Sequence, residues 1–338
     1  MTNPSVRPVI EDERLLDGDQ EVILAPLHGK DRRRGLPKDL FDRRPLRFTV
    51  KFVFAAALIA SAYLTIALSL AGWPGIALAI AVLGLTYAHL VELQHETLHE
   101  HAYRSRRLNR IIGFLCGVFM LSSFSHYKFE HLRHHAFLGT PQNTEFFNYR
   151  FHNLDSLRGF AVAAFHPGRY SGVLRNIIRS LLGRPIPGVN RDRDVRRIRT
   201  EYRLFAIGLI GVVTVSVVTG SYFMVLAWLL PTLLVAEATH FMIELPEHFG
   251  LNTQTDPNVL TNTRSIDASR LAQWYTNYNN LHTAHHYHQG VSMARVAKLH
   301  TMARDGFQVV ESSYPSFYLK VIRGELRYQD RAETCMTR

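Results

Sequence analysis

Histidines recur in this chain at spacings that suit metal binding. Three of them lie in HLRHH (131–135), three more in HTAHH (282–286), and an i, i+4 pair closes HETLH (95–99). On a helix, residues spaced by three or four positions share one face. Neutral imidazole is the commonest metal ligand among side chains. The three motifs therefore predict a metal site assembled from segments that are far apart in the sequence.

The number of histidines predicts two ions. One ion takes roughly four to six donors, and the motifs offer eight imidazoles. A lone histidine is more often an ordinary core or surface residue, but that reading does not explain H-x-x-H-H occurring twice. The eight residues are His95, His99, His131, His134, His135, His282, His285 and His286.

Composition predicts a membrane protein. The 338 residues carry a net charge of +11, yet 47% are hydrophobic, and long uncharged runs alternate with arginine-rich stretches. This segregation is typical of membrane proteins and explains the basic charge better than nucleic-acid binding does. The two cysteines form no framework. The N-terminus lacks a signal-peptide core, so the first membrane segment is expected to stay in the mature protein.

Four helices must position the histidines. Residues 52–88 hold no charged side chain and are divided by GWPG at 72–75. Because about 20 apolar residues span a bilayer, we expect helices near 48–70 and 75–94, then near 203–219 and 221–243. The fold class is thus all-α: a multi-pass protein with two transmembrane hairpins, about 48–94 and 203–243. A helical cap, 95–202 and 244–338, carries the metal site.

Charge predicts the orientation. Neither tight turn of the hairpins carries Lys or Arg, so all 39 basic residues fall on the opposite side or at helix ends. The positive-inside rule makes that side cytosolic. We expect a cell-membrane protein with both termini and the metal site in the cytosol. Residues 1–46 form a polar, partly disordered tail, and 47–338 form the membrane domain.

Two further stretches need an interpretation. Residues 111–124 are apolar but about six residues short of a span, and a crossing there would separate His95 from His131. We therefore interpret them as interfacial or re-entrant. Residues 141–202 form a cytosolic loop rich in arginine, which serves topology, contacts anionic headgroups, or is simply a solvated charge run. HPG at 166–168 is similar to a haem-binding motif of cytochrome b5, but Arg169 replaces its last glycine.

The three histidine motifs resemble those of the membrane fatty acid desaturase and hydroxylase family. Asn280, two residues before His282, matches the family's usual lead-in, and EHFGL at 247–251 is similar to an element that precedes the third box. The resemblance covers about 90–300. It implies a non-haem di-iron centre held almost wholly by histidine, with the eight box histidines as ligands. His248 is the best candidate for a ninth ligand, and His240 is its competitor.

The same reasoning names residues that would support the ligands. Neutral imidazoles leave the positive charge of the metal ions largely uncompensated. We therefore expect nearby carboxylates that accept the second N–H of each imidazole. Side chains expected to contact the ligands, or to add one, are His240, His101, His126, Glu96, Glu244 and Asn280, with Glu92, Glu130, Glu237 and Glu247 as further acids. His28, His89, His152, His166, His288 and His300 are assigned to structure.

Function follows from the cofactor. Iron with O2 can oxidise an unactivated C–H bond, which side chains alone cannot do. We expect a fatty acyl chain or acyl lipid as substrate, and Tyr63, Trp73, Phe223 and Trp228 either line its cleft or pack in the membrane. Electrons must come from a separate ferredoxin, rubredoxin or cytochrome b5, steered by the basic face if it is acidic. No nucleic-acid partner is expected.

Three alternatives stay open. HETLH also fits the H-E-x-x-H motif of zinc metalloproteases, which leaves both H-x-x-H-H motifs unexplained. A metal transporter would place its ligands near the bilayer midplane. Within the family, hydroxylation by a monooxygenase competes with desaturation. The EHFGL element is similar to one of alkane hydroxylases, whereas Leu299 and His300 favour acyl-lipid desaturases.

Overall fold

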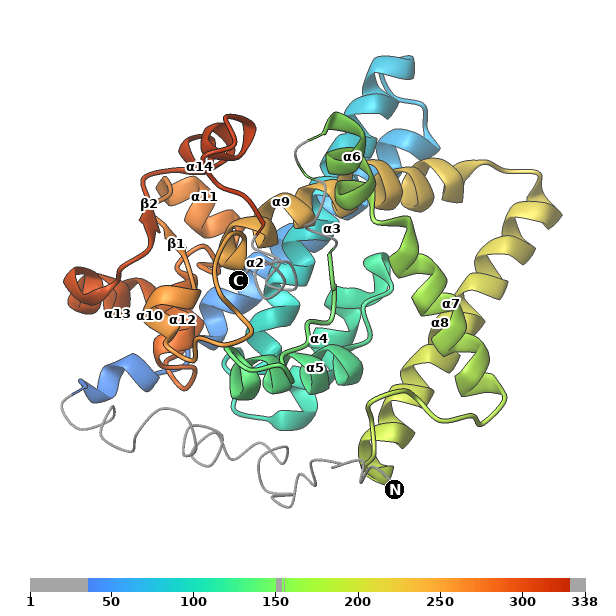
Figure 1. The fold of residues 1–338 in the computed structure, drawn as a ribbon. Helices are drawn as coiled ribbons and strands as arrows, with labels where there is room; N and C mark the ends of the chain where they lie inside the picture. The colour runs from blue at the N-terminus through green and yellow to red at the C-terminus, as the bar shows by residue number, and fades with distance from the viewer. Residues whose placement is uncertain (1–35, 150–153, 155, 329–338) are drawn as a thin grey trace.

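The chain is built almost entirely of helices. A computed structural model describes residues 36–149, 154 and 156–328 (Figure 1). Most of the predicted N-terminal tail, with His28, lies outside the described residues, as does His152. The strands in the described part, β1 (Ser265–Ile266) and β2 (Val310–Glu311), pair in parallel with Ser265 opposite Val310. The predicted all-helical class therefore holds apart from this short ladder.

Within the described residues, four helices are long and apolar enough to cross a membrane. They are α2 (Pro45–Ala67), α3 (Gly72–Leu98), α8 (Asp192–Thr219), and a composite of η5 (Val225–Leu229), η6 (Pro231–Ala236) and α9 (Glu237–His248). A tight turn joins α2 to α3, and Ala71 in this turn has a φ of 56°. The sequence located all four helices.

Several predicted helix ends were wrong. α3 continues past 94 to Leu98, α8 begins at Asp192 instead of 203, and the fourth helix runs to His248 instead of 243. In each case the helix continues beyond its apolar stretch into charged or histidine-rich sequence, where hydropathy gives no signal. The fourth helix is π-helical on both sides of Leu230. Pro231 lacks an N–H and disfavours a regular α-helical ladder there.

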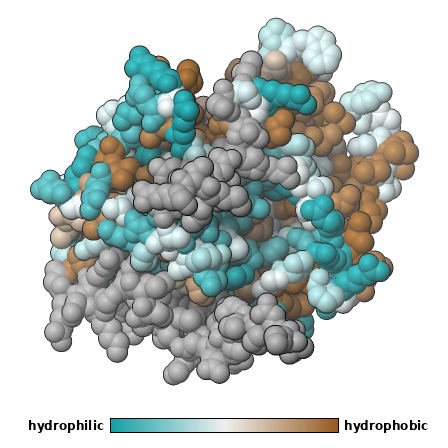
Figure 2. Space-filling model, in the orientation of Figure 1, coloured by the Kyte–Doolittle hydropathy of each residue, from teal (hydrophilic) through white to brown (hydrophobic). Residues whose placement is uncertain are grey.

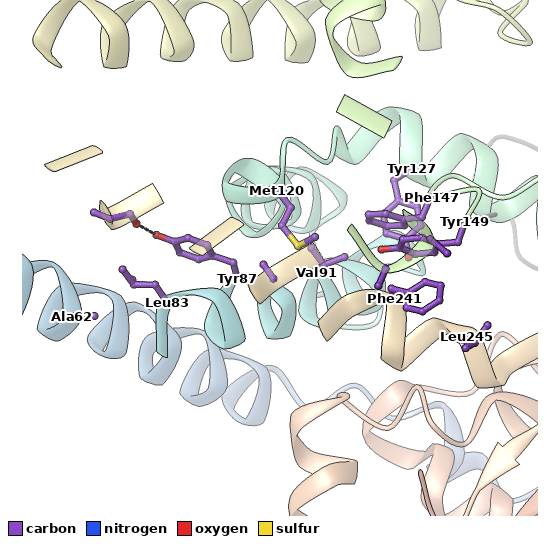
Figure 3. Packing of buried hydrophobic residues seen from close by; sticks show 14 of the residues in the cluster. Ala62, Leu83, Tyr87, Val91, Met120, Tyr127, Phe147, Tyr149, Phe241 and Leu245 are labelled. Carbon is purple, nitrogen blue, oxygen red and sulfur yellow. Dashed lines mark hydrogen bonds between the residues drawn. The ribbon is translucent and has the colours of Figure 1, made fainter. Parts of the chain in front are cut away.

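The middle of the membrane core is held by aromatic residues. The Tyr87 hydroxyl donates to the carbonyl of Ala227 at 2.6 Å (Figure 3), and its ring stacks on Phe119 at 4.4 Å. Tyr63 packs on Phe223 with ring centroids 5.7 Å apart. These contacts join α3 to the fourth helix and to η4 (Val118–Met120), and they join α2 to the residues that begin the fourth helix.

The short apolar run at 111–124 does not form one straight helix. It comprises α4 (Arg106–Gly117), η4 (Val118–Met120) and the start of α5 (Phe124–Phe137), with a bend of 98° between the two halves. A side chain at Gly117 would collide with the Ser122 carbonyl and with Gln94. The bend lets α5 turn back toward α3, as a re-entrant segment would.

The predicted arginine-rich loop is largely helical. It contains α6 (Leu157–Phe165), α7 (Pro167–Leu181) and the first turns of α8. His166 of the HPG motif joins the first two helices with a φ of 37°, and Pro167 begins α7. Ile177 of α7 and Ile198 of α8 share a buried cluster with Phe129 of α5. Apolar residues at helical spacing lay between the arginines, and charge concealed them.

The C-terminal portion is an assembly of short helices. It comprises α10 (Val259–Asn262), α11 (Arg270–Tyr275), α12 (His282–Tyr287), η7 (Met293–Arg295), α13 (Val296–Ala303), η8 (Arg304–Gly306) and α14 (Tyr314–Ile322). The 3-10 helix η3 (Lys38–Phe41), from the predicted polar tail, packs here. Leu40 of this helix is fully buried. Its Asp39 accepts a hydrogen bond from Nζ of Lys298, a residue of α13, at 2.8 Å.

Figure 2 separates the two kinds of surface. Hydrophobic side chains gather at the right of the view, where Figure 1 draws α8, and hydrophilic side chains dominate the left, over the C-terminal helices. On α8, Ile207, Ile210 and Val213 are each at least 60% exposed. An uncovered apolar face of this extent is suited to lipid.

Candidate metal centre

Four elements bring the predicted histidines together. His95 lies in the last turn of α3 and His99 follows as its C-cap. The second box lies in the last two turns of α5, the third box opens α12, and His248 ends α9. Because side chains at i, i+3 and i+4 share a helix face, each box aims its imidazoles in one direction. The described residues contain two groups of four buried histidines.

The first group is His95, His99, His131 and His285. Nε2 of His131 lies 2.9 Å from Nε2 of His95 and 2.8 Å from Nε2 of His99. The ring of His285 lies within 4.8 Å of both α3 histidines, measured between centroids. One histidine from each of α5 and α12 thus completes the pair at the end of α3.

The second group is His134, His248, His282 and His286. Nε2 of His282 lies 3.0 Å from Nε2 of His248. The ring of His134 lies 4.9 Å from the rings of both His248 and His286. Each H-x-x-H-H motif therefore contributes to both groups.

His135 lies between the two groups. Its Nε2 is 3.0 Å from Nε2 of His131 and 3.0 Å from Nε2 of His285, both in the first group. Its ring stacks on His286 of the second group at 4.1 Å. The nine histidines predicted as ligands therefore form one continuous cluster.

The nitrogen spacing fits metal ions. A first-row ion holds imidazole nitrogens at about 2.1 Å, so its ligands lie about 3–4 Å from one another. In each group the candidate ligand atoms all lie within 4.8 Å of one another. Burial, and secondarily nearby imidazoles, lowers the pKa of His285 and His286 well below its usual value. Both rings are therefore neutral at neutral pH, as metal binding requires.

Two hydrogen bonds fix ring orientation in the second group. Nδ1–H of His134 donates to Oδ1 of Asn143 at 2.9 Å, and Nδ1–H of His248 donates to the Asn262 carbonyl at 2.9 Å. With the proton on Nδ1, the Nε2 lone pair is left for a metal. Among described residues, Nδ1 of His282 and Nδ1 of His285 are buried without a hydrogen-bond partner.

The structure places the two candidates for a ninth ligand differently. His248 belongs to the second group, whereas His240 belongs to neither group. Nδ1 of His240 lies 2.9 Å from the Tyr149 hydroxyl, and Nε2 lies 3.4 Å from Glu244 and 3.7 Å from Glu92. His240 therefore connects two predicted acids to the aromatic core beside the cluster.

Of the predicted acids, Glu247 contacts a histidine of the cluster. Its Oε2 lies 3.4 Å from Nε2 of His282. Glu96 instead accepts a bond from Asn277 at 2.7 Å. Glu237 forms a buried ion pair with Arg169 at 2.6 Å, and Glu130 accepts from Thr144 at 2.7 Å.

The remaining predicted neighbours differ in their contacts. His101 stacks on His99 at 5.5 Å, so it does touch the cluster. His126 bonds the Tyr202 hydroxyl at 2.8 Å. Asn280 donates to the Ile266 carbonyl at 2.7 Å and so shapes the turn before α12. The side chain one position earlier, Asn279, reaches the site instead.

Sequence reasoning missed three residues at the site. Asn143 bonds His134, Glu145 lies 3.5 Å from Nδ1 of His134, and Asn279 donates to Glu247 at 2.7 Å. Asn143 and Glu145 follow α5 in a segment without regular structure, where periodicity gives no signal. Asn279 directly precedes the residue that was predicted, so an Asn-Asn pair was the available clue.

Histidines assigned to structure have ordinary partners. His89 stacks on Trp274, His166 bonds the Phe147 carbonyl at 3.0 Å, and His300 bonds Asp267 at 2.9 Å. Three of the four aromatic residues predicted either to line a substrate cleft or to pack do pack. Tyr63 lies against Phe223, and Trp228 donates to the Phe119 carbonyl at 2.8 Å. Trp73 is 73% exposed.

Space exists beside the histidines. A cavity of about 20 Å³ is bounded by His95, His131, His134 and His282, together with acids and aromatic rings. That volume holds about one water-sized molecule. Glu145, Phe146 and Phe147 also line a larger, polar cavity of about 470 Å³. Figure 3 shows Tyr127, Phe147 and Tyr149 side by side, and Tyr127 stacks on Phe146 at 4.9 Å.

Comparison with known proteins agrees with this geometry. A curated relative, dihydrorhizobitoxine desaturase of Bradyrhizobium elkanii, is 22% identical over 303 residues, covering 86% of each chain. The family model for fatty acid desaturases matches residues 71–318, which contain every histidine of the cluster. The chain therefore belongs to the fatty acid desaturase family.

Proposed function

We propose that the two histidine groups hold a non-haem di-iron centre. The observation that carries the proposal is the division of buried imidazoles into two tetrads, with His135 between them. The first ion would be held by His95, His99, His131 and His285, and the second by His134, His248, His282 and His286. The fatty acid desaturase family is a family of non-haem di-iron proteins. Membership supports an oxidoreductase of the desaturase or hydroxylase type.

The chain's own residues prepare the site in three ways. Asn143 and the Asn262 carbonyl hold two imidazoles in the tautomer that leaves Nε2 free. Glu247 and Glu145 place carboxyl oxygens beside the imidazoles of His282 and His134. Tyr127, Phe146 and Phe147 cover the cluster with aromatic surface and exclude bulk water. Bound iron would supply the oxidising power, drawn from O2, that side chains lack.

The reaction we propose is desaturation of a fatty acyl chain or acyl lipid. The relative's name is that of a desaturase, which supports removal of two hydrogens over insertion of oxygen. The polar cavity of about 470 Å³ shares Glu145, Phe146 and Phe147 with the small cavity beside the histidines and leaves room for the polar part of a substrate. Hydroxylation by the same centre is the second candidate, because both reactions begin with removal of one hydrogen from carbon.

The zinc-protease interpretation of HETLH has no support in the geometry. It requires Glu96 to activate water at an ion held by His95 and His99. The Glu96 carboxylate accepts its bond from Asn277, which in turn binds Lys51 at 2.8 Å. A transporter also fits poorly, because the histidines lie at helix ends and not at mid-helix.

The proposed orientation places the cluster in the cytosol of a cell-membrane protein. Both turns, at 68–71 and 220–224, lack charged residues, and the histidines lie at the opposite ends of α3 and α9. The hairpin arrangement α2–α3 and α8–α9, with a cytosolic cap, follows from these positions and the positive-inside rule. Electrons would arrive from a separate ferredoxin, rubredoxin or cytochrome b5, steered toward the basic face.

The test is expression in a host of known lipid composition. Mass spectrometry of lipids and free acids should show a new product lighter by two hydrogens, absent from cells that express His285→Ala. A product heavier by one oxygen would replace desaturation by hydroxylation. Absence of either product, with a fully iron-loaded protein, would remove acyl chains from the proposal.

A further inference from the structure

A basic cavity lies on the side of α5 away from the proposed iron site. It has a volume of about 280 Å³ between α4, α5 and α8. Its floor includes Phe124, Phe129 and Leu132. Its rim carries six cationic side chains: Arg106, Arg107, Arg110, Lys128, Arg193 and Arg197.

The rim is not neutralised by its own acids. Glu100 pairs with Lys128 at 2.8 Å and with Arg106 at 3.2 Å. Asp194, the other acid of the rim, lies 3.9 Å from Arg193. These pairs leave three arginines, Arg107, Arg110 and Arg197, without an ion-pair partner in the part of the chain that the structure describes. An anion is the missing complement.

A second, apolar cavity continues from the basic one. It has a volume of about 360 Å³, and Arg110 and Arg197 line both. Its apolar walls are Ile111, Phe114, Leu115 and Leu204. Its one acid, Glu201, is already engaged, since its carboxylate accepts bonds from Ser123 at 2.7 Å and from the Ser125 backbone at 2.8 Å.

Both walls change character in the same order. Along α4, arginines at 106, 107 and 110 give way to apolar residues at 111, 114 and 115, and along α8 arginines at 193 and 197 precede Leu204. Leu115 and Leu204 are 45% and 46% exposed. A groove that is cationic at one end and open and apolar at the other matches an amphiphile with an anionic head.

We propose that this groove binds one anionic phospholipid. Its phosphate would lie among Arg107, Arg110 and Arg197, and an acyl chain would follow Leu115 and Leu204. An acidic redox protein is the competing ligand for a basic surface. The apolar half that continues from the basic one suits an acyl chain, and it would give an acidic redox protein nothing to neutralise. The inference is independent of the reaction proposed above.

The groove connects the lipid to the proposed iron site. Its floor is the back of α5, so Leu132 faces the groove while His131, its neighbour, faces the cluster. A bound phospholipid would brace the helix that carries the second histidine box. We therefore expect lipid binding to raise the thermal stability of the protein.

Native mass spectrometry of the purified, full-length protein in detergent tests the proposal. Dioleoyl phosphatidylglycerol and dioleoyl phosphatidylcholine share their acyl chains and differ in net charge. The wild type should retain one phosphatidylglycerol at least about tenfold more tightly than phosphatidylcholine. Glycerol phosphate, the head alone, should not compete at the same concentration.

Two variants examine the two halves of the groove. The double variant Arg110→Gln, Arg197→Gln should abolish the preference for phosphatidylglycerol. Leu115→Gln should weaken the binding of both lipids. The matched control, Arg270→Gln with Arg323→Gln, removes the same charge from exposed positions and should behave as wild type. A helical circular-dichroism spectrum and a gel-filtration profile equal to those of the wild type confirm that each variant is folded.

Three results would overturn the proposal. The first is equal retention of the two lipids by wild type. The second is unchanged preference in the folded Arg110→Gln, Arg197→Gln variant. The third is competition by glycerol phosphate as strong as that by the lipid, which would identify a small-anion site. If that arginine variant keeps its lipid but loses turnover with an acidic redox protein, the groove belongs to the electron donor instead.

Discussion

Nε2 of His95 and Nε2 of His131 lie 2.9 Å apart. The segment between them includes the apolar run of α4, and the 98° bend before α5 is what returns the chain to the end of α3. A straight crossing would have placed the two rings on opposite sides of the bilayer. The proposed iron site thus depends on a helix break that lies well outside the histidine boxes.

Removing one histidine from each group should eliminate iron binding at that group. His285→Ala for the first group and His134→Ala for the second should lower turnover by more than about 100-fold, because even a residue that only orients a ligand is worth about 10- to 100-fold. Iron per chain, measured by plasma mass spectrometry, should fall in both. His300→Gln, which alters a histidine bonded to Asp267, is the control and should keep wild-type iron. Full activity in either alanine variant would remove that residue from the ligand set.

The hydrogen bond from His134 to Asn143 should tune one ion. Asn143→Leu removes the acceptor for Nδ1–H at 2.9 Å, so we expect iron affinity of the second group to fall about 10- to 100-fold. Chelator challenge followed by iron analysis should then leave about half of the wild-type iron. Asn252→Ala, in an exposed turn, should lose none. Equal loss from both variants, or from neither, would contradict the assigned role.

Glu201 should stabilise the helix that carries the second box. Its carboxylate accepts hydrogen bonds from the Ser123 hydroxyl and the Ser125 backbone N–H at the start of α5. An acid at a helix N-terminus also interacts favourably with the helix dipole. Glu201→Gln should cost about 1.5–3 kcal/mol and lower the melting temperature by several degrees. The control is Glu325→Gln, at a position 52% exposed, which should not change it. An unchanged melting temperature in Glu201→Gln would show that the cap is dispensable.

The buried pair of Arg169 and Glu237 lends itself to a double-mutant cycle. Its members lie 2.6 Å apart, and Arg169 also donates to the Met120 carbonyl at 2.8 Å, next to the bend before α5. Arg169→Met alone leaves Glu237 buried without its cation and should cost about 3–5 kcal/mol. Adding Glu237→Leu should recover much of that loss. Additive losses in thermal unfolding would mean that the two charges do not stabilise each other.

Much of this organisation was readable from the sequence. Apolar length located four helices, and the histidine spacing identified eight of the imidazoles that converge. The resemblance of EHFGL to an element of the desaturase family added His248. Hydropathy could not locate the end of α9 at His248 or the start of α8 at Asp192, because both extend into polar sequence. Helix ends of this kind are set by packing and not by local composition.

The partners of the ligands were harder to predict. Asn143 and Glu145 lie in an irregular segment whose path depends on long-range contacts, such as the bond from the Gly139 N–H to the Thr253 carbonyl at 2.9 Å. Asn279 and Asn280 are adjacent, and the geometry of the turn before α12 decides which one faces the cluster. Asn279 therefore contacts Glu247 at the site, whereas Asn280, one position later, has a structural role.

The most direct measurement is the metal content of the purified, active protein. We predict about two iron ions per chain and O2 consumption that stops when iron is removed and returns when iron is restored. About one zinc per chain, with no iron and with activity intact, would contradict it.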